Sequence, residues 1–111
     1  MKKNELGAWG EDRAAEYLTE NGFRIVSRNY RCRMGEIDLI AQKEDILAFA
    51  EVKLRKNCRY GEAREFVTAE KQRKLRLAAS YYLAGNSRAQ NLQPRFDVLE
   101  YFSLFSETIL L

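Results

Sequence analysis

The sequence predicts an α/β domain in which a mixed β-sheet is flanked by helices, with the element order α-β-β-β-α-β. Two segments carry apolar residues at helical spacing, and three segments of strand-like pattern lie between them. A last alternating segment follows the second helix, and this arrangement is typical of layered α/β folds. With 111 residues, 46% of them hydrophobic, the chain predicts one domain over 1–111, with a core of about 5–102 and a tail at 103–111.

Residues 5–21 predict the first helix, because Leu6, Gly10, Ala14 and Leu18 recur at helical spacing. Asn21-Gly22 is expected to end it, since glycine supplies the left-handed cap.

Three strands are then expected at 23–30, 36–42 and 46–54. The short polar segment Lys43-Glu44-Asp45 predicts a hairpin turn between the second and third. The third is apolar on both faces until Glu51, which favours a central position in the sheet.

The second helix is predicted from about Thr68, its N-cap, to Leu83. Its apolar stripe comprises Leu75, Ala78, Ala79 and Tyr82, and its outward face carries Lys71, Arg73, Lys74 and Arg76. Residues 86–94 are expected to form a polar loop, and the alternation from Phe96 to Phe102 predicts the last strand. The pattern assigns no structure to the apolar tail.

Composition excludes several kinds of chemistry. The chain contains no histidine, so Ser-His-Asp and Cys-His catalysis are excluded, and any reaction must use carboxylates, lysine, tyrosine or a bound metal. Cys32 and Cys58 lie too far apart for a CxxC motif and are expected to be reduced thiols. No targeting or membrane-spanning segment is recognised, so the expected location is the cytoplasm.

The net charge of +3 is unevenly distributed. Residues 53–76 contain nine Lys and Arg against three Glu, whereas 1–52 contain eight against ten acids. Such a concentrated basic segment suits a polyanion, although a solvated helix face would look the same. The residues expected to contact nucleic acid are Arg55, Lys56, Arg59, Lys71, Arg73 and Lys74.

Two strands carry charges inside apolar patterns. Asp38 interrupts the second strand, and Glu51 and Lys53 emerge on one face of the third. A hairpin centred on Glu44-Asp45 would place Asp38 opposite Glu51 and Ile40 opposite Phe49. Carboxylates about 5 Å apart repel unless a cation joins them, which indicates a Mg²⁺ or Mn²⁺ site. A slip of one residue would separate the acids onto opposite faces.

The same hairpin register would place Glu36 opposite Lys53. A further acid, Glu11, falls on the inward stripe of the first helix and is a candidate third ligand, although an acid near a helix N-terminus can instead favour the helix dipole. Asp38, Glu51 and Lys53 could instead form a structural ion-pair cluster, in which the two acids share the lysine and no metal is bound.

The expected chemistry is hydrolysis of a phosphodiester bond. A divalent ion bound by Asp38, Glu51 and the Val52 carbonyl would bind a phosphate oxygen and lower the pKa of a water. Lys53 would orient or deprotonate that water, or stabilise charge developing on phosphorus.

With these residues in place, the chain resembles the PD-(D/E)XK nuclease superfamily. More closely, it resembles the YraN-like bacterial family, which is related to archaeal Holliday junction resolvases. The blocks that carry the resemblance, over about residues 5–102, are Gly7–Glu11, Asn21–Phe23, Arg28–Arg31, Gly35–Ala41, Phe49–Lys53, Tyr60-Gly61 and Arg95–Asp97. The superfamily's proline before the acid is replaced here by Ile37.

The resemblance implies a restriction-endonuclease-like core with the metal site in a cleft. The acid that the resolvase relatives carry on the first helix falls on Glu11, and their dimeric state suggests a homodimer. The leading hypothesis is a Mg²⁺- or Mn²⁺-dependent DNA endonuclease that either tolerates different DNA structures or is directed to branched or junction DNA. The alternatives are a nucleic-acid-binding module that does not cut, and an interaction protein that uses the tail from Phe102 to Leu111.

Overall fold

The computed structural model describes the backbone of residues 3–55, 68–104 and 107–110, and the side chains of residues 7–53 and 68–100. Its elements in chain order are α1 (Lys3–Glu20), β1 (Arg24–Cys32), β2 (Gly35–Lys43), β3 (Ile46–Arg55), α2 (Ala69–Ala84), the 3₁₀ helix η2 (Ser87–Asn91), β4 (Gln93–Leu104) and β5 (Glu107–Leu110).

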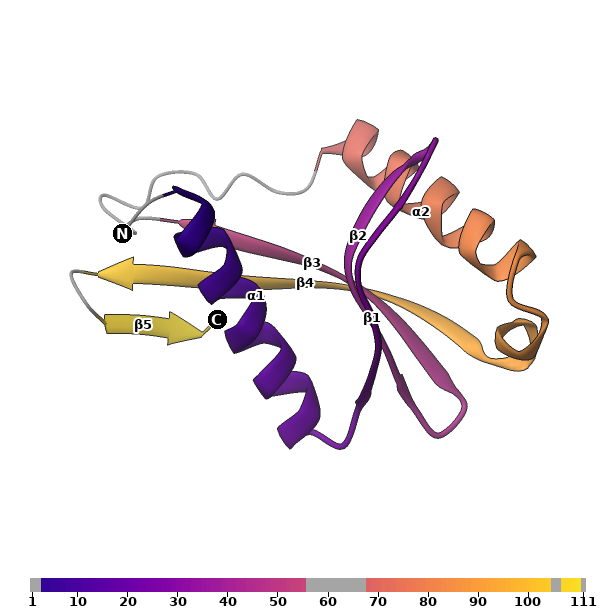
Figure 1. Ribbon diagram of the computed structural model, residues 1–111, viewed down its shortest axis with the longest axis horizontal. Coiled ribbons are helices and arrows are strands. Elements are labelled where there is room, and N and C mark those ends of the chain that lie inside the picture. Colours follow the sequence, from indigo (N-terminus) through magenta and orange to yellow (C-terminus); the bar gives the residue numbers. More distant parts are fainter. Residues whose placement is uncertain (1–2, 56–67, 105–106, 111) are drawn as a thin grey trace.

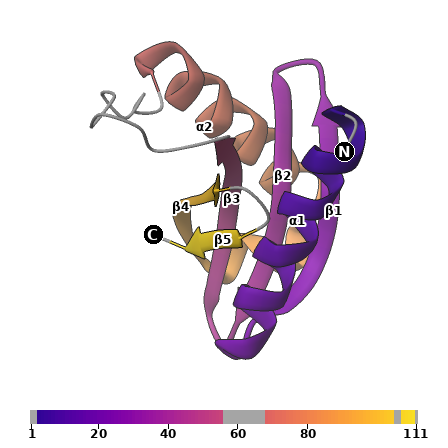
Figure 2. The same ribbon diagram turned by 90° about the vertical axis from the view of Figure 1, so that its left-hand side faces the viewer.

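The strands form one mixed sheet in the order β1-β2-β3-β4-β5. β3 and β4 are parallel and joined through α2, and the other neighbouring pairs are antiparallel. The predicted α/β class and the order α-β-β-β-α-β are therefore confirmed. In Figure 1, β3 and β4 run together along the length of the molecule, the β1–β2 hairpin twists away from them, and α1 and α2 lie on either side of that hairpin. Figure 2 shows α1 lying along the hairpin.

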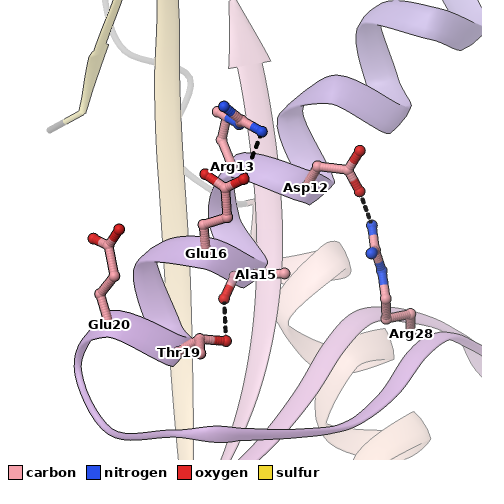
Figure 3. Close-up of a pocket in the computed structure, with 7 residues that line it drawn as sticks. All are labelled: Asp12, Arg13, Ala15, Glu16, Thr19, Glu20 and Arg28. Atoms are coloured by element: carbon pink, nitrogen blue, oxygen red, sulfur yellow. Dashed lines mark hydrogen bonds and ion pairs between the residues drawn. The ribbon is translucent and has the colours of Figure 1, made fainter.

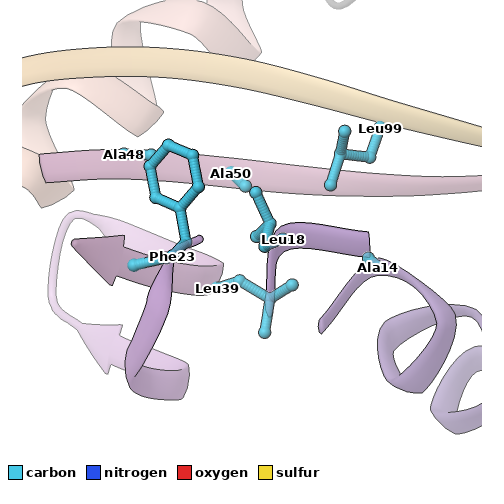
Figure 4. Packing of buried hydrophobic residues seen from close by; sticks show 8 residues of the cluster. Ala14, Leu18, Phe23, Leu39, Ala48, Ala50 and Leu99 are labelled. Carbon is cyan, nitrogen blue, oxygen red and sulfur yellow. The ribbon is translucent and has the colours of Figure 1, made fainter. Parts of the chain in front are cut away.

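One hydrophobic cluster lies between α1 and the sheet. Figure 4 shows that α1 contributes Ala14 and Leu18, while Leu39, Ala48 and Ala50 come from the central strands. The helical spacing of Ala14 and Leu18 predicted this face of α1, and both side chains are buried. Small alanines on the sheet allow the helix to pack closely.

A second cluster lies between α2 and the opposite face of the sheet. The predicted helix stripe supplies Leu75, Ala78 and Ala79, which pack with buried residues of β2 and β3. The largest of these is Phe49, which is fully buried. β3 is therefore covered on both faces, as its nearly continuous apolar sequence predicts.

Local signals fix the ends of these elements. Gly22 has a φ of +89° directly after α1, as a left-handed cap requires. The Thr68 hydroxyl accepts a hydrogen bond from the backbone N–H of Lys71 at 3.1 Å, so the predicted N-cap of α2 is confirmed. Glu44 has a φ of +54° in the β2–β3 turn, where a two-residue hairpin needs a left-handed residue.

Three features differ from the sequence prediction. The polar loop contains η2, β4 already begins at Gln93, and the tail includes β5, which pairs with β4 over residues 101–104. The predicted loop from Asn57 to Gly61 lies outside the described residues. Within the parts of the chain that are described, no helix is both long and apolar enough to cross a membrane.

Candidate functional site

The register of the β2–β3 hairpin decides whether the acidic residues meet. The paired residues run from Lys43–Ile46 at the turn to Leu39–Ala50, and they include Ile40 opposite Phe49. This is the register that the two-residue turn predicts, so that prediction is confirmed over the paired segment. The one-residue slip that would have moved the acids to opposite faces does not occur.

The pairing stops one step before Asp38, and the strands separate there. The expected oppositions of Asp38 with Glu51 and of Glu36 with Lys53 are therefore not formed as strand pairs. Side-chain alternation also breaks here. Strict alternation would place Ile37 and Leu39 on one face, but Ile37 joins Ile40 in the cluster under α2, whereas Leu39 joins the cluster under α1. On β1, Asn29 lies level with Asp38 and has a φ of +55°. Asp38 thus lies at a fork between β2 and β3.

The Asp38 carboxylate takes the place of the missing strand partner. Its Oδ2 accepts a hydrogen bond from the backbone N–H of Val52 at 2.8 Å. The pKa of Asp38 is raised from 3.8 to about 6. Burial is the largest cause, the charges of Glu11, Glu51 and Glu36 raise the pKa further, and the Val52 hydrogen bond opposes the rise. This carboxyl is held where its charge is unfavourable, which is characteristic of functional carboxyls and of cation sites.

Glu51 and Lys53 lie on β3 beyond the last paired residue. Both are on the α2 side of the sheet, as their spacing from Phe49 predicts. Lys53 Nζ is 3.8 Å from Glu51 Oε1, and the two side chains are 19% and 24% exposed. At that separation they attract one another without a direct hydrogen bond.

Glu11 approaches the fork from α1. Its side chain is half-buried, as its place on the inward helix stripe predicts, and of the three neighbouring acids its charge has the largest effect on the pKa of Asp38. Within the described residues, however, no three acidic or cysteine side chains converge closely enough to hold a metal ion. The negative charge of Glu11 therefore repels that of Asp38, but Glu11 does not complete a three-carboxylate cluster among the described residues.

Glu36 has a different partner from the expected one. It lies across from Arg31 of β1, with Arg31 Nε 3.4 Å from its Oε2, and both side chains are largely exposed. The negative charge of Glu36 nevertheless repels that of Asp38 and so raises the pKa of the Asp38 carboxyl. Glu36 was not predicted as a site residue; the available signal was its position two residues before Asp38 on the same strand.

The basic face of α2 is solvent-exposed. Lys71, Arg73 and Lys74 are all exposed, and Glu70 pairs with Arg73 at 3.0 Å and with Lys74 at 3.9 Å. Lys74 lies against the start of β2, since a Cβ added at Gly35 would lie 3.7 Å from Lys74 Cβ. The other predicted nucleic-acid contacts, the Arg55 side chain and the whole of Lys56 and Arg59, lie outside the described residues.

A surface depression of about 480 Å³ between α1 and β1 is separate from this site. Figure 3 shows two ion pairs among its charged side chains: Arg28 contacts Asp12, and Arg13 contacts Glu16, each at 2.7 Å. Glu20 is a further acid in its lining, which does not include Asp38, Glu51 or Lys53.

The fold and the fork together define a class: an α/β domain in which acids from two strands and a helix surround a half-buried aspartate, and a lysine lies beside one of these acids. Comparison with known families gives a more specific result. Residues 10–100 match the model of the Uncharacterised protein family UPF0102. The chain belongs to this family, which is the YraN-like family that its sequence blocks resemble.

Individual relatives agree over most of their length. A UPF0102 protein of Symbiobacterium thermophilum is 54% identical over 97 residues, covering 86% of this chain and 80% of the relative. Relatives from Caldicellulosiruptor saccharolyticus and Clostridioides difficile are 41% and 42% identical, covering 92% and 94% of this chain and 86% and 90% of their own lengths. The family match, over residues 10–100, therefore covers the whole fork region, α2 and most of α1.

Proposed function

We propose that this protein is a metal-dependent nuclease of the PD-(D/E)XK type that hydrolyses phosphodiester bonds in DNA, with branched or junction DNA as its preferred substrate. The observation that carries this proposal is the state of Asp38. The Asp38 carboxyl is half-buried, its pKa is raised to about 6, and the charges of Glu11, Glu51 and Glu36 surround it. A bound cation would offset the repulsion between these negative charges.

The donor set fits Mg²⁺ or Mn²⁺, with Asp38, Glu51 and the Val52 carbonyl as the proposed ligands. Mg²⁺ is commonly bound through one or two carboxylates and keeps several waters, so a three-carboxylate cluster is not required. The Val52 N–H points to Asp38, and in a strand the C=O of the same residue points to the same side. Glu11 is proposed as an additional ligand that acts directly or through a water. When bound, the ion supplies Lewis-acid activation of a phosphate oxygen and of a water.

The remaining chemistry is assigned to residues of the chain. Lys53 lies beside Glu51, and its ammonium group is proposed to orient the attacking water and to stabilise negative charge that develops on the phosphate. Asp38 is held by the Val52 N–H, so its free oxygen has a fixed direction. Because histidine is absent, proton transfer falls to Lys53 or to solvent.

The DNA backbone is proposed to lie along the exposed basic face of α2, where Lys71, Arg73 and Lys74 would contact phosphates. Arg55, Lys56 and Arg59, in the same basic segment of the sequence, are proposed to extend this contact. A cytoplasmic location and a homodimer complete the proposal. A homodimer would present two sites to a branched substrate.

The test is a cleavage assay with purified protein on duplex, single-stranded and branched DNA, with and without Mn²⁺. We expect Mn²⁺-dependent cleavage that Asp38→Ala abolishes while leaving DNA binding intact. Asp45→Ala is a matched control, because Asp45 is an exposed acid in the β2–β3 turn. Cleavage that persists in Asp38→Ala would show that it comes from another site or a contaminant.

The second candidate is a nucleic-acid-binding module of the same fold that does not cut. The observation that favours it is that, within the described side chains, no three acids gather into a metal-binding group. Wild-type protein that binds these DNAs but leaves them intact with every divalent ion tested would favour this candidate. A protein-interaction role for the tail rests on side chains beyond the described ones.

A further inference from the structure

β4 leaves apolar side chains exposed on the face of the sheet that carries Glu51 and Lys53. The parallel register places Phe96 beside Phe49, Val98 beside Glu51 and Glu100 beside Lys53. Phe96 is 44% exposed and Val98 46% exposed. The cluster under α2 draws on β1, β2 and β3 but on no described residue of β4, so α2 leaves this strand uncovered.

The Phe96 ring is held in a fixed orientation. It stacks on Phe49 with a centroid distance of 5.6 Å and an interplanar angle of 26°. Phe49 is fully buried and packs edge-on against Tyr82 of α2 at 6.0 Å. One side of the Phe96 ring is thus supported by the core, while nearly half of the residue remains exposed.

Phe96 lies close to the acidic site along the sheet. Because it is level with Phe49, it lies two residues before Glu51, or roughly 7 Å along the strands. This distance is about two nucleotide steps of ~3.4 Å in a stacked DNA strand. A strand whose phosphate lies at Glu51 and Lys53 therefore has a base within reach of the Phe96 ring.

The surroundings of Phe96 and Val98 favour a nucleic-acid strand over a protein partner. The core of a protein interface is depleted of charged residues, yet Glu51 lies beside Val98, and Lys53 beside Glu100, on this same face. Lys53 carries a positive charge on this face, and Lys71, Arg73 and Lys74 are exposed on α2. Fixed aromatic rings next to cations are the usual means of binding unpaired nucleotides.

We propose that Phe96 is a stacking platform for an unpaired base next to a phosphate that Lys53 contacts, so that the preferred substrate is DNA with unpaired nucleotides at the reactive position. This proposal rests on the proposed function for its substrate class. It adds a recognition residue and a reason for preferring gapped or branched DNA over matched duplex.

The test measures binding in EDTA, so that its result does not depend on cleavage. Fluorescence anisotropy would compare a matched duplex, a duplex with a short gap of unpaired thymidines, and the same gap carrying abasic residues. For the wild type we expect the gapped duplex to bind roughly five- to hundredfold more tightly than the abasic one, as one stacked base provides. For Phe96→Ala we expect this ratio to fall to about one.

The base-to-abasic ratio is internal to each variant, so a uniform loss of affinity does not alter it. Phe96→Trp should keep the ratio, and Tyr17→Ala, which removes an exposed aromatic ring from α1, should leave it unchanged. An unchanged ratio in folded Phe96→Ala would overturn the proposal. So would a loss of self-association in Phe96→Ala with intact DNA binding, because the surface would then be an interface between copies. Mn²⁺-dependent cleavage of the same DNAs, measured separately, reports on the proposed function alone.

Discussion

Replacing Asp38 by asparagine should make the metal-free protein more stable at neutral pH. The amide oxygen of asparagine can still accept the hydrogen bond from the Val52 N–H, while the unfavourable charge is removed. The pKa of Asp38 rises from 3.8 to about 6 on folding, which at ~1.4 kcal/mol for each pH unit gives an upper limit of ~3 kcal/mol. Because the carboxyl is only partly buried, solvent screening reduces the expected gain to ~1–2 kcal/mol.

The pH dependence of this gain follows from the direction of the shift. A raised pKa in the folded state means that folding favours the protonated acid, so ionisation destabilises the fold as pH rises. The advantage of Asp38→Asn should be absent below about pH 3.8, grow between about pH 4 and 6, and be complete above about pH 6.5. In melting temperature this is a rise of roughly 4–10 °C near neutral pH.

The assay is urea or thermal denaturation of both proteins in EDTA across this pH range. Asp45→Asn, in the exposed turn, is the matched control and should change stability by less than about 0.5 kcal/mol. Adding Mn²⁺ should stabilise the wild type and leave Asp38→Asn unchanged. An Asp38→Asn protein that is equally or less stable than the wild type at neutral pH would refute the reasoning.

The remaining predictions concern α1, α2 and DNA binding. Glu11→Gln should lower the pKa of Asp38 by removing the largest of the three acidic repulsions, and NMR titration of the Asp38 carboxyl carbon would detect this; an unchanged midpoint would mean that Glu11 does not reach the site. Thr68→Ala should destabilise the protein by ~1 kcal/mol through loss of the N-cap bond, as measured by urea denaturation. Neutralising Lys71, Arg73 and Lys74 together should weaken DNA binding and reduce the steepness of its salt dependence between ~50 and ~200 mM salt, whereas an unaltered slope would place the phosphates elsewhere.

Local and periodic features of the fold were predictable from the sequence. The two-residue turn at Glu44-Asp45 fixes the β2–β3 register, and the apolar stripes of both helices correctly identify the faces that pack on the sheet. β5 was missed because its short apolar segment has no periodicity that separates strand from tail. Its partner is the end of β4, and such pairing depends on tertiary context.

The fork was the part of the site that sequence reasoning could not predict. Counting residues from the turn assumes that an ideal ladder continues to Asp38, and it predicts Asp38 opposite Glu51. The ladder instead ends at Leu39–Ala50, and the break in alternation at Asp38 coincides with the positive φ of Asn29 on β1. Asparagine adopts that conformation at low cost, but nothing in a single strand's pattern indicates where it will do so.

The fork gives Asp38 two separable roles, and the asparagine variant distinguishes them. Its carboxylate satisfies the Val52 N–H that β2 no longer pairs, and a neutral amide can do the same. Its negative charge, by contrast, is unfavourable on balance in the metal-free fold, because burial and the charges of Glu11, Glu51 and Glu36 together outweigh the hydrogen bond from the Val52 N–H. If the role of residue 38 were purely structural, an amide would fill it at least as well as a carboxylate. If Asp38→Asn gains stability while losing Mn²⁺ binding and DNA cleavage, the charge serves the cation and the reaction, and the backbone hydrogen bond alone serves the fold.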